Sequence, residues 1–170
     1  HGIPAARILF SDQDRKEIAM CIDQILSTGK LTLGPYGEEF EHELARLCQT
    51  KYAVAVSSGT ASLEIVLRSW GITSGNVLVP TNTFFATTAA GRHAGANVKF
   101  VDMNPHTLAP SLDQLQAARD REAKAVIIVH IGGTLSDELP AIRAWCDREG
   151  LRFLEDAAHA HGSTLNGKAA

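Results

Sequence analysis

The 170-residue sequence lacks a long run of one charge sign and lacks a long apolar run. Its 16 Lys and Arg residues against 19 Asp and Glu residues give a net charge of −3, and no basic stripe is visible. Such a stripe is expected of nucleic-acid-binding proteins, whose affinity depends on neutralising phosphates. No stretch approaches the roughly 18 consecutive apolar residues of a membrane span. We therefore expect neither a nucleic-acid partner nor a membrane partner.

Cysteine is scarce and scattered. Cys21, Cys48 and Cys146 form no CxxC pair, which argues against a disulfide framework and a zinc knuckle. The segment His1–Pro4 has no basic stretch followed by an apolar one, so we expect no secretory signal. Together with a composition typical of soluble globular proteins, these features predict a cytoplasmic protein.

Short apolar runs recur from residue 53 onward. Five runs rich in Val, Ile, Leu or Phe are Ala53–Ser57, Val77–Pro80, Val98–Asp102, Ala125–His130 and Leu151–Glu155. Segments with helical spacing lie between them: Ala61–Trp70, Phe85–His93, Leu112–Arg121 and Leu139–Arg148. Because the runs are apolar throughout and do not alternate, we expect strands covered on both faces. The repeated βα pattern predicts an α/β fold with a mostly parallel sheet.

The first fifty residues have a different pattern. Ser11–Leu26 and Glu38–Gln49 predict amphipathic helices, and Thr28–Gly37 between them predicts a loop. We expect residues 1–50 to be a helical segment of the same domain as the α/β part, residues 51–170.

Near the other end, the pair Asn166 and Gly167 is typical of a hairpin turn. The sequence stops three residues later, so we expect a hairpin without its second strand and a truncated domain.

Candidate site residues are sought at strand ends, because open parallel sheets bind ligands beyond the carboxyl ends of their strands. Ser58, Gly59 and Thr60 follow the first predicted strand and precede a helix. Small residues at such a turn suit a phosphate, which the helix N-terminus attracts. The simpler alternative is that Ser58 or Thr60 caps the helix.

Aromatic and acidic residues follow two other predicted strands. Phe84 and Phe85 could stack on an aromatic cofactor ring, or they could belong to the core. Asp156 leaves a buried strand and needs a partner, for example a protonated ring nitrogen, unless it faces solvent or caps a helix.

Histidines lie near the same strand ends. His159 and His161 with Asp156 suggest a metal site, but no further ligand of obvious type lies near in the sequence, so we expect no metal. His130 could reach the same cleft, although a structural role for this histidine is the simpler interpretation.

The motifs, taken in order, resemble one known family. Ala53–Leu63 resembles the pattern AVxxSGTxAL. Further matches along the chain are Gly34–Pro35, Phe40–Glu41, Val79–Pro80, Thr83–Thr87, Phe100–Asp102, Val129–His130, Gly133, Glu155–Gly162 and Asn166–Lys168. This ordered set resembles the DegT/StrS family of pyridoxal 5'-phosphate (PLP)-dependent aminotransferases, which act on nucleotide-linked keto sugars. The resemblance covers nearly the whole chain and implies the large domain of fold type I.

The resemblance also implies roles for individual residues. Ser58, Gly59 and Thr60 would hold the cofactor phosphate, and Phe84 would stack on the pyridine ring. Asp156 would pair with the ring nitrogen and keep it protonated, which makes it the implied catalytic residue of this chain. His159 stands where the family usually has glutamine, near the phenolic oxygen of the cofactor.

Three departures from the family pattern stand out. Gly75–Val77 is one residue shorter than the usual motif, and Ile131–Gly133 lacks an aromatic residue. The family's Schiff-base lysine lies beyond the end of this sequence, and Lys168 belongs to the turn. We therefore expect these residues alone not to transaminate.

The implied function is transfer of an amino group from an amino acid, glutamate above all, to a keto group of a nucleotide-linked deoxysugar. The implied setting is deoxysugar and antibiotic biosynthesis by a homodimer. Alternatives within the family are a sugar dehydratase, with histidine in place of lysine, and an enzyme forming an aminated cyclitol or an aminobenzoate. Outside it, the alternatives are a non-catalytic domain binding a sugar nucleotide or a partner, and a nicotinamide-dependent oxidoreductase. The last is disfavoured because no glycine-rich fingerprint follows the first predicted strand.

Overall fold

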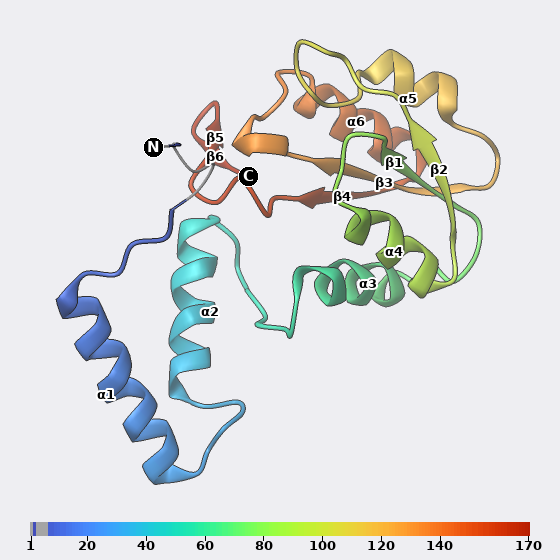
Figure 1. Ribbon diagram of the computed structural model, residues 1–170. Coiled ribbons are helices and arrows are strands. Elements are labelled where there is room, and N and C mark those ends of the chain that lie inside the picture. The colour runs from blue at the N-terminus through green and yellow to red at the C-terminus, as the bar shows by residue number, and fades with distance from the viewer. Residues whose placement is uncertain (1, 3–6) are drawn as a thin grey trace.

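A parallel sheet forms the centre of the structure, a computed structural model that describes residue 2 and residues 7–170 (Figure 1). Its four strands are β1 Asn76–Pro80, β2 Asn97–Val101, β3 Ala123–Val129 and β4 Arg152–Asp156. They lie in the order β2-β1-β3-β4, and every neighbouring pair is parallel. The predicted α/β fold with a parallel sheet is confirmed, and four of the five predicted strands form.

Helices cover both faces of this sheet (Figure 1). On one face lie α3 Gly59–Ser69 and α4 Phe85–Ala94, and on the other lie α5 Leu112–Ala118 and α6 Leu139–Glu149. Successive residues of a strand point to opposite faces. In β1, Val77 and Val79 therefore pack in the core cluster that holds α3 and α4, while Leu78 packs in the cluster that holds α5 and α6. Burial of both faces explains why the central strands β1 and β3 are almost continuously apolar, whereas the outer strands β2 and β4 are only partly buried and carry charged residues.

The predicted strand at Ala53–Ser57 is wrong. The structure assigns no strand there, and none of the described strands pairs with the segment. The side chain of Val54 is 75% exposed, and the N–H of Ala55 donates to Glu41 Oε1 at 2.7 Å. A strand satisfies its N–H and C=O groups through a neighbour. A composition typical of strands is therefore not sufficient to form a strand at Ala53–Ser57, because the described residues offer no neighbouring strand to pair with it.

Two helices precede this segment: α1 Asp12–Thr28 and α2 Pro35–Leu47. The first begins with a capping box between Ser11 and Asp14. The second begins three residues before its predicted start, because proline is favoured at the first helical position, where no N–H is needed. The predicted loop at Thr28–Gly37 is correspondingly too long. Neither helix buries a side chain, and both extend away from the sheet (Figure 1).

The end of the sequence forms a complete short hairpin. Strand β5, Thr164–Leu165, pairs antiparallel with β6, Lys168–Ala169, around a turn at Asn166 and Gly167. Both turn residues have positive φ, 53° and 79°, which is the conformation the Asn-Gly pair favours. The expectation of a hairpin without its second strand is therefore wrong, since two residues suffice to pair.

Two sequence expectations concern the beginning of the chain. The sequence predicts no secretory signal at His1–Pro4, but residue 1 and residues 3–6 lie outside the described residues. Within the described part, no helix is both long enough and apolar enough to cross a lipid bilayer.

Candidate functional site

The carboxylate of Asp156 is held by donors from two different elements. Asp156 is the last residue of β4, and its Oδ2 accepts a hydrogen bond from the hydroxyl of Thr87 at 2.9 Å. Its Oδ1 accepts from the N–H of Ala158 at 3.3 Å. Thr87 lies in the first turn of α4 and is fully buried. Two carboxylate oxygens offer about four acceptor positions, so Asp156 keeps capacity for a further donor.

Three predicted site residues line one small hollow. Phe84, Asp156 and His159 border a cavity of about 50 Å³ at the carboxyl ends of β3 and β4. Both Phe84 and Phe85 are 70% exposed, and their rings meet edge to face with centroids 4.8 Å apart. The alternative that these aromatics belong to the core is wrong. An exposed aromatic face beside an anchored carboxylate is suited to a flat, cationic ring.

His159 is oriented by the short 3-10 turn η1, Ile131–Gly133. The N–H of Gly132 donates to His159 Nδ1 at 3.3 Å. A neutral imidazole that accepts at Nδ1 carries its proton on Nε2. Gly133 has a φ of 79°, and a Cβ there would lie 2.8 Å from the carbonyl oxygen of His159. Glycine at position 133 therefore allows the backbone to approach the carbonyl of His159 closely. Because Nδ1 of His159 accepts a hydrogen bond, the neutral ring presents Nε2–H as a donor.

Ser58, Gly59 and Thr60 lie at the start of α3. The hydroxyl of Ser58 accepts from the N–H of Ala61 at 3.1 Å, so the capping alternative is confirmed for Ser58. The N–H groups of Gly59 and Thr60 have no acceptor among the residues that the structure describes. Free N–H groups of a first helical turn attract anions.

These three residues do not line the hollow that holds Asp156. Figure 1 shows α3 and α4 beginning at the end of the sheet where β4 finishes. The assignment of the phosphate to this helix start stays a prediction.

A second acid at the same strand end faces the opposite way. Glu155 Oε1 lies 3.2 Å from Nε2 of the buried His130, and Glu155 Oε2 accepts from Arg143 of α6 at 2.6 Å. Burial favours a higher pKa for Glu155, but the hydrogen bond from His130 and the charge of Arg143 together hold that pKa below its ordinary value. Neighbouring strand residues point to opposite faces, so the side chains of Glu155 and Asp156 lie on opposite faces of the sheet.

The buried ring of His130 therefore pairs with Glu155, as the structural interpretation expected, and His130 also borders the hollow that holds Asp156. Its Nδ1 has no hydrogen-bond partner within the described part of the chain. Among the same residues, no group of three or more His, Cys, Asp or Glu side chains could hold a metal ion.

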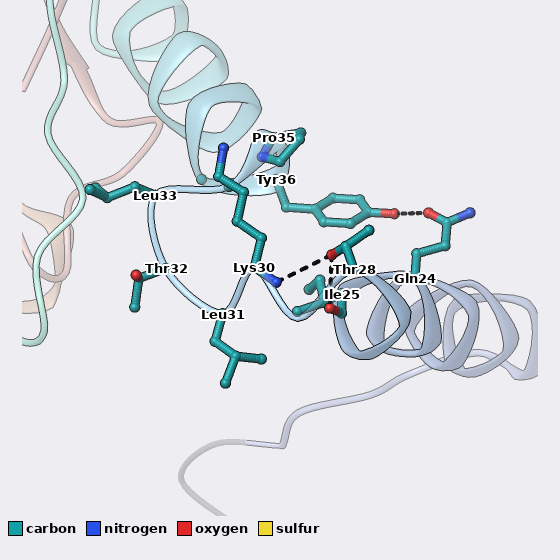
Figure 2. A pocket seen from close by; sticks show the side chains of 11 residues that line it. Gln24, Ile25, Thr28, Lys30, Leu31, Thr32, Leu33, Pro35 and Tyr36 are labelled. Atoms are coloured by element: carbon teal, nitrogen blue, oxygen red, sulfur yellow. Dashed lines mark hydrogen bonds between the residues drawn. The ribbon is translucent and has the colours of Figure 1, made fainter.

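A larger hollow of about 340 Å³ lies between the end of α1 and the start of α2 (Figure 2). The hydroxyl of Tyr36 is hydrogen-bonded to Gln24, and the N–H of Lys30 donates to Thr28 Oγ1 at 3.4 Å. Figure 2 shows Leu31 and Leu33 pointing away from the ring of Tyr36. Within the described residues, the walls of this hollow come from α1, α2 and their connecting loop alone.

Thr87, which bonds Asp156 beside the hollow that Phe84 and His159 border, was not identified from the sequence. It belongs to the Thr83–Thr87 motif, but nothing local distinguishes its hydroxyl from that of Thr88. The available signal is its place at the third position of α4, because the residue at the N-cap of that helix, Phe84, makes no side-chain cap. Its partner Asp156 is 69 residues away in sequence.

Residues 12–170 match the DegT/DnrJ/EryC1/StrS aminotransferase family. The chain belongs to this family. It is 39% identical over 157 residues to the dTDP-3-amino-3,4,6-trideoxy-alpha-D-glucose transaminase of Streptomyces venezuelae, which covers 91% of this chain and 41% of that protein. It is also 34% identical over 169 residues to the GDP-perosamine synthase of Vibrio cholerae, and this match covers 98% of this chain and 44% of that protein. The family resemblance inferred from the motifs is confirmed.

Solved structures of the family have the same fold. NtdA from Bacillus subtilis, solved with its bound cofactor PMP, matches with a TM-score of 0.87 and 34% identity over 95% of this chain and 37% of that chain. The predicted large-domain fold of PLP-dependent aminotransferases is confirmed. The chain spans about two fifths of the length of the curated relatives it matches.

Proposed function

We propose that this chain is the cofactor-binding part of a PLP-dependent aminotransferase. The whole protein transfers an amino group from an amino acid, with glutamate as the expected donor, to a keto group of a nucleotide-linked deoxysugar. The relatives named as a dTDP-sugar transaminase and a GDP-perosamine synthase support this substrate class. The observation that carries the proposal is the anchored carboxylate of Asp156 beside the exposed ring of Phe84 in one hollow.

The residues of this site fit a phosphorylated pyridine ring. Asp156 accepts two donors and has acceptor capacity left for a ring N–H, while Phe84 offers an aromatic face. His159 presents an Nε2–H donor, and the N–H groups of Gly59 and Thr60 are available to a phosphate. Bound PLP supplies an electron sink for the bond that breaks at the amino-acid Cα. The Schiff-base lysine belongs, in this proposal, to a part of the protein beyond these residues.

The proposal extends to the organisation of the protein. Residues 1–50 are a helical segment of the same domain as the cofactor-binding residues 51–170, in a cytoplasmic homodimer of deoxysugar and antibiotic biosynthesis. The exposed apolar side chains on α1 support a second copy as partner.

Amino transfer can be followed directly in the whole protein. The purified protein is mixed with PLP, ¹⁵N-labelled glutamate and a dTDP-linked keto deoxysugar, and the sugar is analysed by mass spectrometry. We expect an aminated sugar that carries the label. A sugar that loses a hydroxyl without gaining ¹⁵N would indicate the dehydratase alternative.

Cofactor binding can be tested without turnover. Pyridoxamine 5'-phosphate, the amine form of the cofactor, is titrated by equilibrium dialysis. We expect Asp156→Asn to weaken binding at least tenfold, because a hydrogen bond between charged partners contributes about 1.5–3 kcal/mol. We expect Phe84→Ala to weaken it about fivefold, since stacking contributes on the order of 1 kcal/mol. Phe100→Ala, an exposed aromatic of β2, is the matched control. Unchanged binding in both site variants would remove this hollow from the proposal.

A further inference from the structure

The hydroxyls of Thr83 and Thr87 form a short chain of hydrogen bonds (the string) that ends at the carboxylate of Asp156. The Oγ1 atoms of Thr83 and Thr87 lie 2.8 Å apart, and Thr87 in turn bonds Asp156 Oδ2 at 2.9 Å. Thr83 borders the hollow, whereas Thr87 is fully buried. A buried hydroxyl is costly unless it is hydrogen-bonded. A valine of nearly the same shape would avoid that cost, so the threonine at position 87 points to a polar role.

The direction of every proton in this string follows from the chemistry of its last member. An ionised carboxylate only accepts hydrogen bonds, so Thr87 must donate its single proton to Asp156. The contact between the two hydroxyls then requires Thr83 to donate to Thr87. Thr83 Oγ1 also lies 3.3 Å from the carbonyl oxygen of Phe84, which is the longer of its two contacts. The string therefore supplies an oriented hydrogen-bond donor, the hydroxyl of Thr87, to the carboxylate.

The same string fixes the plane of the carboxylate. Oδ2 is held from α4 by Thr87, and Oδ1 is held from the turn after β4 by the N–H of Ala158. Two donors from separate elements leave little freedom to rotate. The remaining acceptor positions of Asp156 are those available to a ligand in the hollow beside Phe84.

We propose that Thr87, supported by Thr83, is the positioning residue that makes Asp156 select a ring with a protonated nitrogen. This inference rests on the proposed function and adds a residue to it. A ring that presents N–H⁺ can use the oriented, ionised carboxylate, whereas a ring with C–H at the same place cannot. Loss of the Thr87 hydroxyl frees the carboxylate to rotate and removes a donor, so the selection weakens while stacking on Phe84 remains.

Paired ligands measure this selection. The purified protein is titrated by equilibrium dialysis with pyridoxamine 5'-phosphate and with its analogue in which C–H replaces the ring nitrogen. We expect the wild-type protein to prefer the nitrogen-containing ligand, and Thr87→Val to reduce that preference about tenfold, the scale of one hydrogen bond to a charged group. Thr87→Ser, which restores the hydroxyl, should keep the preference. Thr88→Val, the neighbouring threonine of the same helix, should leave it unchanged.

The outcomes separate this inference from the proposed function. Failure of the wild-type protein to bind pyridoxamine 5'-phosphate would overturn the proposed function itself. A wild-type preference that persists in full in Thr87→Val would overturn the positioning role alone. Equal wild-type affinity for the two ligands would overturn the positioning role and also the pairing of Asp156 with the ring nitrogen. If thermal melting shows that Thr87→Val does not fold, Thr83→Ala decides. Thr83 is partly exposed and is separated from Asp156 by the hydroxyl of Thr87. If Thr83→Ala keeps the full ligand preference of the wild-type protein, the inference is overturned.

Discussion

Two adjacent acids at the end of β4 have different partners because they face opposite sides of the sheet. Asp156 turns toward α4 and meets a neutral hydroxyl, so its charge remains available to a ligand. Glu155 turns toward α6 and meets His130 and Arg143, so its charge is used inside the fold. Two carboxylates one position apart therefore differ in role: Glu155 contributes to stability, and Asp156 is the one proposed to bind a ligand.

The depressed pKa of Glu155 predicts a pH-dependent contribution to stability. The folded-state pKa lies below the ordinary value of 4.5, so the stabilisation is present above about pH 4.5 and is lost as the pH falls through the folded-state pKa. We expect Glu155→Gln to lower the free energy of unfolding by about 1–2 kcal/mol at pH 7, which corresponds to hydrogen bonds with charged groups at a mostly buried site. The difference should shrink below pH 4.

Thermal melting across pH checks this expectation. Glu149→Gln is the matched control, because its pair with Arg119 is more exposed and should contribute less than about 1 kcal/mol. A Glu155→Gln variant that melts with the wild-type protein at pH 7, or whose deficit grows toward low pH, would contradict the assignment.

At the scale of the elements, the helix starts at the site differ in how they are capped. The start of α3 is capped within its own sequence by Ser58. The start of α4 has no side-chain cap at Phe84 and is instead tied through Thr87 to the end of β4. The start of α3 is therefore determined by a local cap, whereas the start of α4 is positioned by a contact with a residue distant in the sequence.

The local cap of α3 can be removed selectively. We expect Ser58→Ala to lower the free energy of unfolding by about 1 kcal/mol, because the N–H of Ala61 loses its acceptor, whereas Ser58→Gly should cost only a few tenths. Urea denaturation measures both variants. Equal losses for alanine and glycine would show that the hydroxyl cap is not the source of the effect.

At the scale of the whole molecule, the N-terminal helices leave apolar surface open. Ile18, Ile22 and Leu26 follow one another at four-residue spacing on α1, and their side chains are 43%, 50% and 65% exposed. The described contacts between the N-terminal segment and the α/β part are few. One is a hydrogen bond from Gln49, just after α2, to the carbonyl of Gly167 at 3.4 Å. A contiguous exposed apolar stripe is typical of an interaction surface.

The proposed homodimer predicts that this stripe is covered in solution. Analytical ultracentrifugation of the wild-type protein should give the mass of two chains. We expect Ile22→Glu to shift it toward one chain, because a charge in an apolar interface is costly. Lys16→Glu, which introduces the same side chain at an exposed polar position of α1, is the control. A wild-type protein that sediments as one chain at high concentration would contradict the proposal.

The sequence by itself determined the features that depend on local periodicity. Short apolar runs predicted β1 to β4, most clearly the central strands β1 and β3, whose two faces are buried. The helical spacing between the runs predicted α3 to α6. Ser58 was recognisable as a cap, and Asp156 as an acid in need of a partner, from their positions at strand ends. The ordered motifs were specific enough to indicate the family.

Only the tertiary structure decided the features that depend on a partner distant in the sequence. Ala53–Ser57 has the composition of a strand but has no neighbouring strand among the described residues. It forms no strand because a strand requires hydrogen bonds to a neighbour. Thr87 and Asp156 meet across 69 residues, and no local pattern encodes that contact. Periodicity reports which face of an element is buried, whereas the identity of the group that satisfies a buried hydroxyl or carboxylate follows from how the elements pack.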